Sequence, residues 1–255
     1  MITHPNVKVN LGLSVIGKRP DGFHDIETLF VPYMGVADDL EIVEAPEFGI
    51  DIEMEGGVAW DPQTDLTARA YRMLAADFDI PAVHISLRKN APVGAGLGGG
   101  SSDAAFALLM MDELFSLGLP KEKLAEYAGR LGSDCAFFVY NTPMFGSGRG
   151  EVLEPFDIDL SGYELRVVSP KGIAVSTAEA YRGVKYHNGK PLREVLSQPV
   201  ETWKDELVND FELTVFAAHP ELADYKRNLY DEGAIYASMS GSGSSLFGLF
   251  PIFKS

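Results

Sequence analysis

The stretch A-P-V-G-A-G-L-G-G-G-S-S-D-A-A, residues 91–105, constrains this chain more than any other part of the sequence. Glycine adopts positive φ and lets a ligand approach the backbone closely, because it has no Cβ. Ser101, Ser102 and Asp103 follow, any of which can cap a helix, and an apolar run at helical spacing comes next. Free N–H groups that lead into a helix N-terminus form an anion site. The pattern therefore predicts a phosphate loop rather than a flexible linker.

Two common nucleotide-binding loops fit this stretch poorly. Gly94, Gly96 and Gly99 satisfy the dinucleotide pattern G-x-G-x-x-G, which should directly follow a strand buried on both faces. Residues 83–89 instead alternate apolar and polar side chains, which is typical of a half-solvated strand. A Walker A loop would need lysine at the position of Gly100. Phosphate would therefore be held by the backbone and the helix dipole, with any cation coming from elsewhere in the chain or from a metal ion.

Composition limits the location and the partners of this protein. A net charge of −16 over 255 residues argues against nucleic acids and anionic membranes as partners, since both require a basic surface. Cys135 is the single cysteine, which excludes an internal disulfide and fits a reducing compartment. The N-terminus lacks the features of a signal peptide, and no apolar run reaches membrane-spanning length. We therefore expect a cytoplasmic protein, either a monomer or a homodimer.

Periodicity along the chain predicts a mixture of strands and helices. Strands are expected at 6–17, 23–34, 39–44, 49–55, 83–89, 164–168, 234–238 and 246–250, with a hairpin or bulged strand pair at 144–151. Helices are expected at 64–78, 102–117, 121–131, 176–182, 209–218 and 221–230. After the strand at 164–168, the pattern of expected elements changes to a run of helices. We place the boundary between domains 1–162 and 163–255 near Gly162.

Several ordered motifs resemble the GHMP kinases, the family of galactokinase, homoserine kinase and mevalonate kinase. The matching motifs are Pro92–Asp103, residues 5–11, 18–24, 132–134, 148–151, 175–181 and 240–243. The resemblance covers nearly the whole chain, and it implies a two-domain α+β fold. The N-terminal domain would hold a mixed or antiparallel sheet with helices, and the C-terminal domain would be a ferredoxin-like α/β sandwich. Family members usually continue with a further helix and strand, so this C-terminal domain could be truncated.

The resemblance also implies the reaction. The chain would be an enzyme that uses ATP and Mg²⁺, and the N-terminal motifs indicate a cytidine-diphospho methylerythritol as the small-molecule substrate. The γ-phosphoryl group would move to the tertiary 2-hydroxyl of the methylerythritol unit, in non-mevalonate isoprenoid biosynthesis. The residues implied at the ATP phosphates are Pro92, Val93, Gly94, Ala95, Gly96, Leu97, Gly98, Gly99, Gly100, Ser101 and Ser102. Ser102 could also contact Mg²⁺.

Two residues are implied as catalytic. Lys8 would stabilise developing charge and keep Asp134 ionised, because a nearby opposite charge favours the carboxylate. Asp134 would take the proton of the acceptor hydroxyl or orient that hydroxyl. Without the surrounding motifs the simpler interpretation would be preferred, in which Lys8 lies on a solvated strand face and Asp134 caps a helix.

The implied substrate-binding residues are Asn10, Phe23, His24, Phe30 and Tyr181. Asn10 shares the strand face of the catalytic lysine. His24 would hydrogen-bond the cytosine edge, and Phe23 could stack on the base, although the family more often has tyrosine there. Phe30 and Tyr181 are weaker candidates, since aromatic residues of regular elements usually belong to the core.

Three alternatives stay open at this point. The chain could be a GHMP kinase for another small alcohol, such as homoserine, mevalonate or a sugar, or it could be a non-catalytic nucleotide-binding protein. An NAD-dependent enzyme is a more distant alternative. The small-residue run at 240–245 is expected to support the phosphate loop structurally, and Cys135 is expected to be a buried small residue.

Overall fold

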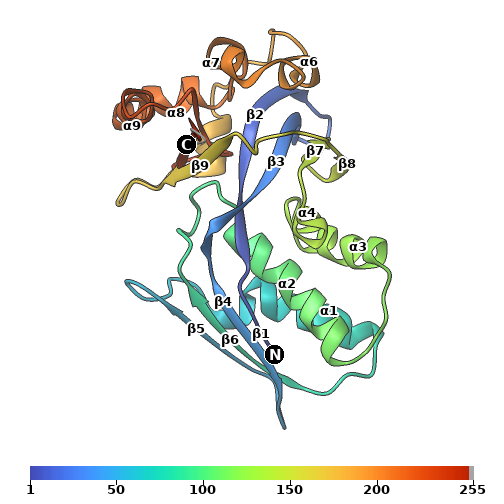
Figure 1. Ribbon diagram of the computed structural model, residues 1–255. Helices are drawn as coiled ribbons and strands as arrows, with labels where there is room; N and C mark the ends of the chain where they lie inside the picture. Colours follow the sequence, from blue (N-terminus) through green and yellow to red (C-terminus); the bar gives the residue numbers. More distant parts are fainter. Residues whose placement is uncertain (253–255) are drawn as a thin grey trace. The chain divides into compact units, whose positions relative to one another are not determined.

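The computed structural model describes residues 1–252, which separate into two compact units (Figure 1). The first unit contains Met1–Val7, Val36–Val93 and Gly98–Thr142, and the second contains Lys8–Gly35, Gly94–Leu97 and the chain from Pro143 onward. Each unit is thus assembled from separate segments of the chain. The expected domains 1–162 and 163–255 are continuous stretches of sequence, and that boundary stays a prediction.

The first unit is built on a four-stranded sheet. Its strands are β1 (Ile2–Thr3), β4 (Asp39–Glu44), β5 (Gly49–Met54) and β6 (Val83–Lys89), in the order β1-β4-β6-β5. β6 pairs antiparallel with β4 and parallel with β5. The alternation predicted along β6 is confirmed, because Val83, Ile85 and Leu87 are buried while the residues between them are more exposed.

Helices of the first unit pack together beside this sheet. They are α1 (Leu66–Asp77), α2 (Gly99–Leu114), α3 (Lys121–Leu131) and α4 (Cys135–Tyr140), with a 3₁₀ turn η1 (Pro62–Thr64) before α1. α2 contacts α1, α3, α4 and strand β4. Its buried side is made largely of alanine, leucine and methionine, which explains why the helix that follows the glycine loop lies at the centre of this unit.

The second unit contains two antiparallel sheets. One has the order β2-β3-β7-β8 and consists of β2 (Asn6–Lys18), β3 (His24–Ala37), β7 (Met144–Ser147) and β8 (Val152–Pro155). The other has the order β10-β11-β9 and consists of β9 (Tyr163–Val168), β10 (Tyr236–Met239) and β11 (Leu246–Pro251). The strand pair expected at 144–151 is confirmed as the β7–β8 hairpin.

Short helices complete the second unit. They are α5 (Thr177–Tyr181), α6 (Leu192–Leu196), α7 (Trp203–Glu206), α8 (Glu212–Ala218) and α9 (Pro220–Asp231), with the 3₁₀ turn η2 (Val200–Thr202). Residues from β2, from the β10–β11 pair and from α5, α8 and α9 form one apolar core. Strands β10 and β11 are buried almost throughout. The truncation of the C-terminal domain stays a prediction.

Two predicted helix starts were wrong. α2 begins at Gly99 instead of residue 102, because Gly98 takes the left-handed conformation with φ +72° and occupies the N-cap position. Ser101, Ser102 and Asp103 therefore lie inside the helix, and no side chain caps it. α8 begins at Glu212 instead of residue 209. Asn209 lies in a turn before that helix. Its Oδ1 accepts the N–H of Phe211, and its Nδ2 donates to two backbone carbonyl oxygens.

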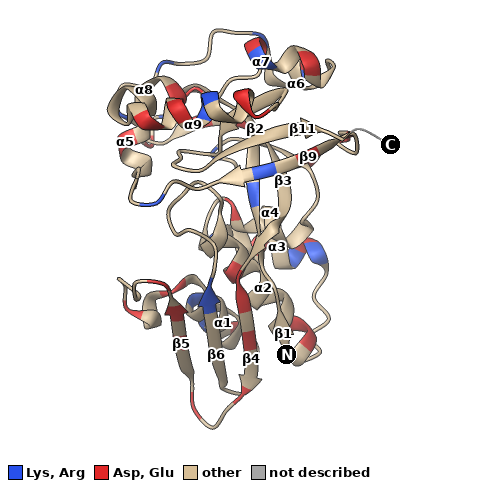
Figure 2. Ribbon diagram, turned by 60° about the vertical axis from the view of Figure 1, so that its left-hand side comes forward, with Lys and Arg blue, Asp and Glu red and all other residues tan. Residues whose placement is uncertain are grey.

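Charged residues occur in both units, and acidic ones predominate. The ribbon in Figure 2 is coloured red for acidic residues on strand β4 and on the helices of the second unit, in keeping with the net charge of −16. Among residues 1–252, no helix has the combination of length and apolar character needed to cross a membrane.

Candidate active site

The phosphate loop joins β6 to α2 through a series of turns with glycines in the left-handed region. Gly94, Gly96 and Gly98 have φ of +68°, +79° and +72°, so each position favours glycine as predicted. Because no side chain caps α2, the first N–H groups of the helix have no side-chain acceptor. Such N–H groups, together with the positive end of the helix dipole, suit a phosphate ligand.

Lys8 is buried against this loop within the second unit. Its side chain extends from β2, only 3% of the residue is exposed, and its Nζ donates to the carbonyl oxygen of Gly96 at 2.9 Å. Its backbone N–H also donates to the carbonyl of Leu97 at 3.0 Å. The ammonium lies 5.5 Å from the ring centroid of Phe30, a buried side chain. The interpretation of Lys8 as a solvated strand residue is therefore wrong, and β2 and the loop are bonded to each other.

Asn10 connects Lys8 to a chain of buried polar groups. Its Oδ1 accepts from Lys8 Nζ at 2.5 Å, and its Nδ2 donates to Thr28 Oγ1 at 2.9 Å. Thr28 in turn donates to the carbonyl oxygen of Gly12 at 2.6 Å. Asn10 thus shares the site of Lys8, as its strand parity predicted, and it restrains the ammonium. Direct contact between Asn10 and substrate stays a prediction.

The run 240–245 packs against the loop, which confirms its expected supporting role. Ser240 Oγ donates to the carbonyl of Gly96 at 3.0 Å, and the N–H of Ser245 donates to the carbonyl of Ala95 at 3.1 Å. Asn209 Nδ2 donates to two carbonyl oxygens around Ser240, each at 2.8 Å. The loop segment 94–97 is therefore held from two directions within the second unit, by β2 and by this run.

Two of the predicted substrate residues form a stacked pair. The rings of His24 and Tyr181 lie with centroids 4.5 Å apart and planes inclined by 16°, and Tyr181 meets Phe211 edge-on at 4.7 Å. Phe23 is 54% exposed, and the guanidinium of Arg149 lies 4.8 Å from its ring centroid. In the second unit, the His24 imidazole thus stacks on Tyr181, and the ring of the preceding residue, Phe23, is exposed.

Asp134 lies in the first unit, at the N-terminal end of α4. It occupies the N-cap position, yet its side chain makes no capping hydrogen bond. The neighbouring Cys135 is buried, and burial raises the pKa of its thiol to about 12 against the opposing hydrogen bond from Ser101, so the thiol stays protonated. Cys135 is a buried small residue, as expected. Because Lys8 and Asp134 belong to different units, their joint action on one hydroxyl stays a prediction.

Metal-binding groups are sparse. Within residues 1–252, no group of three or more histidine, cysteine, aspartate or glutamate side chains could hold a metal ion. Ser102 Oγ is buried and has no hydrogen-bond partner among the described residues. A Mg²⁺ ion keeps several waters and is usually held by one or two protein carboxylates together with substrate phosphates, so it needs no dedicated cluster of protein ligands, and the Ser102 hydroxyl is one oxygen that could join it. The residues present therefore fit a metal that arrives with the nucleotide.

Sequence reasoning missed three polar residues that shape the site. Thr28 shares its strand parity with Ile26 and Phe30, which are both buried, so a buried hydroxyl could have been predicted. Lys89 falls on the same parity as the apolar face of β6, which is an unusual place for lysine. Asp38, which pairs with Lys89, follows β3 directly and has no comparable signal in the sequence.

Comparisons with known proteins agree with this architecture. The N-terminal domain of the GHMP kinases matches residues 65–142, and the C-terminal domain of that family matches residues 192–252. The chain belongs to the GHMP kinase family, so the predicted fold class and the expectation of a phosphotransferase are confirmed.

Individual relatives are similar along almost the whole chain. A 4-diphosphocytidyl-2-C-methyl-D-erythritol kinase from Bacteroides fragilis is 46% identical over 254 residues, which is 98% of this chain and 92% of the relative. The kinase of the same name from Porphyromonas gingivalis is also 46% identical, over 256 residues, with the same coverage of both chains. A crystal structure of 4-(cytidine 5'-diphospho)-2C-methyl-D-erythritol kinase has a TM-score of 0.81 and 34% identity, and covers 98% of this chain and 90% of its own.

Proposed function

We propose that this chain transfers the γ-phosphoryl group of ATP to the 2-hydroxyl of 4-diphosphocytidyl-2-C-methyl-D-erythritol, a step towards isoprenoid precursors by the non-mevalonate route. The observation that carries the chemistry is the buried Lys8 ammonium, bonded at 2.9 Å to the glycine-loop carbonyl of Gly96. The choice of substrate rests on the name of relatives that are 46% identical over 98% of the chain.

The loop and the start of α2 would hold the polyphosphate. Left-handed glycines at 94, 96 and 98 leave the backbone open to an approaching anion, and the uncapped N–H groups of α2 point positive charge towards it. Mg²⁺ would neutralise phosphate charge when bound, with Ser102 Oγ as the hydroxyl that the chain contributes.

Lys8 and Asp134 would act on the acceptor hydroxyl. Lys8 would place its ammonium beside the charge that develops as the phosphoryl group moves, while Asn10 and the carbonyl of Gly96 fix its position. Asp134, whose side chain does not cap α4, would orient the hydroxyl and accept its proton. Because phosphoryl transfer depends mainly on positioning and charge neutralisation, the restraint on Lys8 supports this assignment.

The aromatic pair would recognise the cytosine base. His24 carries ring nitrogens that can hydrogen-bond a base edge, and Tyr181 stacked behind it limits its rotation. The exposed ring of Phe23 offers a face for stacking without a hydroxyl group. The single, buried Cys135 is consistent with a reducing, cytoplasmic location for this metabolic step.

The test is ADP release by the purified protein with ATP, Mg²⁺ and one alcohol at a time. We expect turnover with 4-diphosphocytidyl-2-C-methyl-D-erythritol and only background release with homoserine, mevalonate or galactose. Preference for one of the other alcohols would keep the kinase chemistry and reject this substrate. Binding of ATP without turnover of any alcohol would indicate a non-catalytic nucleotide-binding protein.

A further inference from the structure

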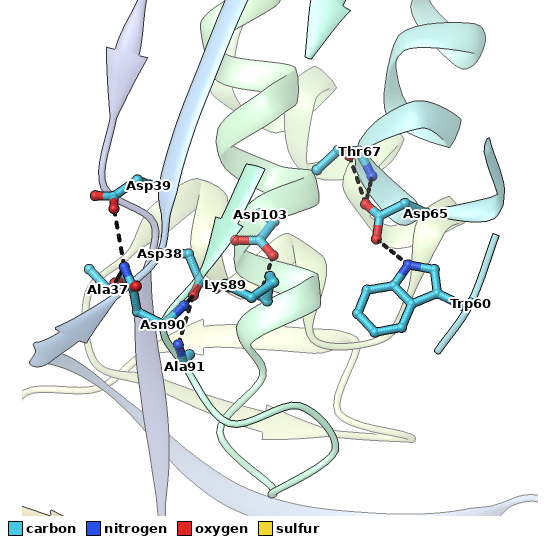
Figure 3. A network of polar contacts seen from close by, with 10 residues as sticks. All are labelled: Ala37, Asp38, Asp39, Trp60, Asp65, Thr67, Lys89, Asn90, Ala91 and Asp103. Carbon is cyan, nitrogen blue, oxygen red and sulfur yellow. Dashed lines mark hydrogen bonds and ion pairs between the residues drawn. The ribbon is translucent and has the colours of Figure 1, made fainter. Parts of the chain in front are cut away.

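A buried cluster of three ionisable side chains lies at the base of the phosphate loop, within the first unit (Figure 3). Lys89 is the last residue of β6, Asp103 belongs to the first turns of α2, and Asp38 lies between β3 and β4. Their side chains are 4%, 2% and 0% exposed. Lys89 Nζ contacts Asp38 Oδ2 and also donates to Asp103 Oδ2 at 2.5 Å. One ammonium thus links the end of β6 to α2 and to the connection between β3 and β4.

The cluster also holds the backbone where the loop begins. Asp38 Oδ1 accepts the N–H of Asn90 at 2.6 Å and the N–H of Ala91 at 2.8 Å. The Asn90 side chain donates to the carbonyl of Ala37 at 3.0 Å and to Asp39 Oδ2 at 3.2 Å. The backbone that leads into the loop is therefore fixed by one carboxylate oxygen, Asp38 Oδ1, and by the side-chain amide of Asn90.

The end of the loop rests on the same three side chains. A Cβ built on Gly99, the first residue of α2, would lie 3.4 Å from Lys89 Nζ and 3.6 Å from Asp38 Oδ2. These are van der Waals contact distances, so the first residue of α2 lies directly beside the cluster. Asp103, one turn further along the helix, completes the link through its bond to Lys89. Entry and exit of the loop are thus anchored at one point.

The buried pairing of Lys89 indicates that its ammonium does not bind the phosphate ligand directly. Its ammonium is shared by two carboxylates and is buried, so its charge is already compensated inside the protein. Burial lowers the pKa of Lys89, but the two aspartates outweigh it and raise the pKa overall, which keeps the lysine charged. Burial raises the pKa of Asp103 well above its ordinary value although Lys89 opposes this effect, and Asp103 Oδ1 has no hydrogen-bond partner among the described residues.

We propose that Lys89, Asp38 and Asp103 are positioning residues that hold the two ends of the phosphate loop at a fixed separation, and that ATP affinity depends on this cluster. The inference rests on the proposed use of ATP. Loss of the link would leave the loop backbone free to sample conformations in which its N–H groups no longer converge on the phosphates, and binding would then have to order them.

The decisive variant is Asp103→Ala, which cuts the link to α2 and leaves the charge-balanced pair of Lys89 and Asp38. We expect ATP to bind about tenfold more weakly, because the hydrogen bond from the charged Lys89 ammonium to Asp103 is lost. The KM for the alcohol substrate should change by less than about twofold. Amide hydrogen exchange of peptides covering residues 92–100 should become faster in the protein without nucleotide. Asp103→Ser, whose shorter side chain does not reach Lys89, should give the same readings if Asp103→Ala is insoluble.

Two further variants separate positioning from general stability. Asp103→Asn keeps an oxygen acceptor for Lys89 and mimics the neutral acid, so its ATP affinity and loop exchange should stay close to those of the unmodified chain. Tyr127→Phe removes the 2.6 Å bond to Asp77 elsewhere in the first unit. It should lower the melting temperature without changing ATP affinity or exchange at 92–100.

The outcomes are distinct. Unchanged ATP affinity together with unchanged exchange at 92–100 in Asp103→Ala would overturn the proposal, as would an equal effect of Tyr127→Phe on both readings. If the unmodified chain does not bind ATP at all, the proposed function fails, while the exchange measurement still decides whether the cluster holds the loop.

Discussion

The hydroxyl of Ser240 donates a hydrogen bond to the carbonyl oxygen of Gly96, with 3.0 Å between the two oxygen atoms. At this contact the loop backbone approaches the backbone of residue 240 so closely that a Cβ on Gly96 would overlap the Ser240 carbonyl. Gly96 also has φ of +79°, where side chains are strained. Gly96→Ala should lower the free energy of unfolding by about 2–4 kcal/mol, as measured by urea denaturation without nucleotide.

Gly94→Ala is the matched control for that change. Gly94 has a similar φ of +68°, but a Cβ there would have nothing within 4 Å. Only backbone strain should act, so we expect a loss of about 1–2 kcal/mol. Equal losses for the two variants would show that the approach of Ser240 to the loop does not restrict residue 96.

The stack of His24 on Tyr181 predicts an effect on one substrate only. Tyr181→Ala removes the ring that lies 4.5 Å from the imidazole and leaves His24 free to rotate. The KM for the cytidine substrate should rise about three- to tenfold, the value of one aromatic pair, while the KM for ATP stays constant. Tyr181→Phe retains the stack and should behave like the unmodified chain. A comparable rise in both KM values would contradict a role in base recognition.

Removal of the Lys8 ammonium should abolish most of the turnover. Lys8→Met should lower kcat by about 10²–10³-fold, the usual effect of losing one group that stabilises transition-state charge. Lys226→Met is the control within the same unit, because Lys226 is likewise a lysine held by a polar partner, with its Nζ 2.6 Å from Glu212 Oε2. Single-turnover measurements at saturating ATP should show a loss for Lys8→Met alone; retained turnover there would exclude a catalytic role for Lys8.

The buried Asp103 predicts a pH dependence of stability. Burial raises the pKa of Asp103 well above its ordinary value, and Asp38 adds to this effect while Lys89 opposes it. Above the unfolded-state pKa of about 3.9, the folded protein therefore retains a proton that the unfolded chain has released. The folded state binds more protons in that window, so this group makes stability fall as the pH rises through it.

Asp103→Asn lacks this titration and tests it. The free energy of unfolding of the variant should increase relative to that of the unmodified chain as the pH is raised from about 4 to about 7. Denaturation at several pH values measures the difference. Two curves that stay parallel over this range would show that Asp103 titrates normally in the folded protein.

Local patterns predicted much of the secondary structure, because the physics of these elements is local. The periodicity over residues 6–17, 83–89 and 121–131 predicted the elements found there, which are β2, β6 and α3. The start of α2 could not be predicted in this way. It depends on Gly98 taking a left-handed conformation and on Gly99 lying against a buried cluster, and both are tertiary effects.

The site was predictable only where ordered motifs mark it. Lys8, Asn10 and the glycine loop were anticipated, and the second unit brings them together through the contacts of Lys8 Nζ. Spacing alone favoured a solvated Lys8, because a period of two cannot tell a polar face in water from one covered by a distant loop. Lys89 was missed for the converse reason, since one carboxylate partner, Asp38, lies 51 residues away and the other, Asp103, lies beyond the glycine loop.

The most direct test of the account is the turnover of Asp134→Ala with ATP and 4-diphosphocytidyl-2-C-methyl-D-erythritol, measured together with its ATP affinity. The Asp134 side chain makes no capping hydrogen bond to α4, so the start of that helix does not depend on such a bond. The account predicts that ATP binds normally while ADP release falls by at least about 10²-fold. Turnover close to that of the unmodified chain would contradict the assignment of Asp134 to the acceptor hydroxyl and, with it, the proposed mechanism.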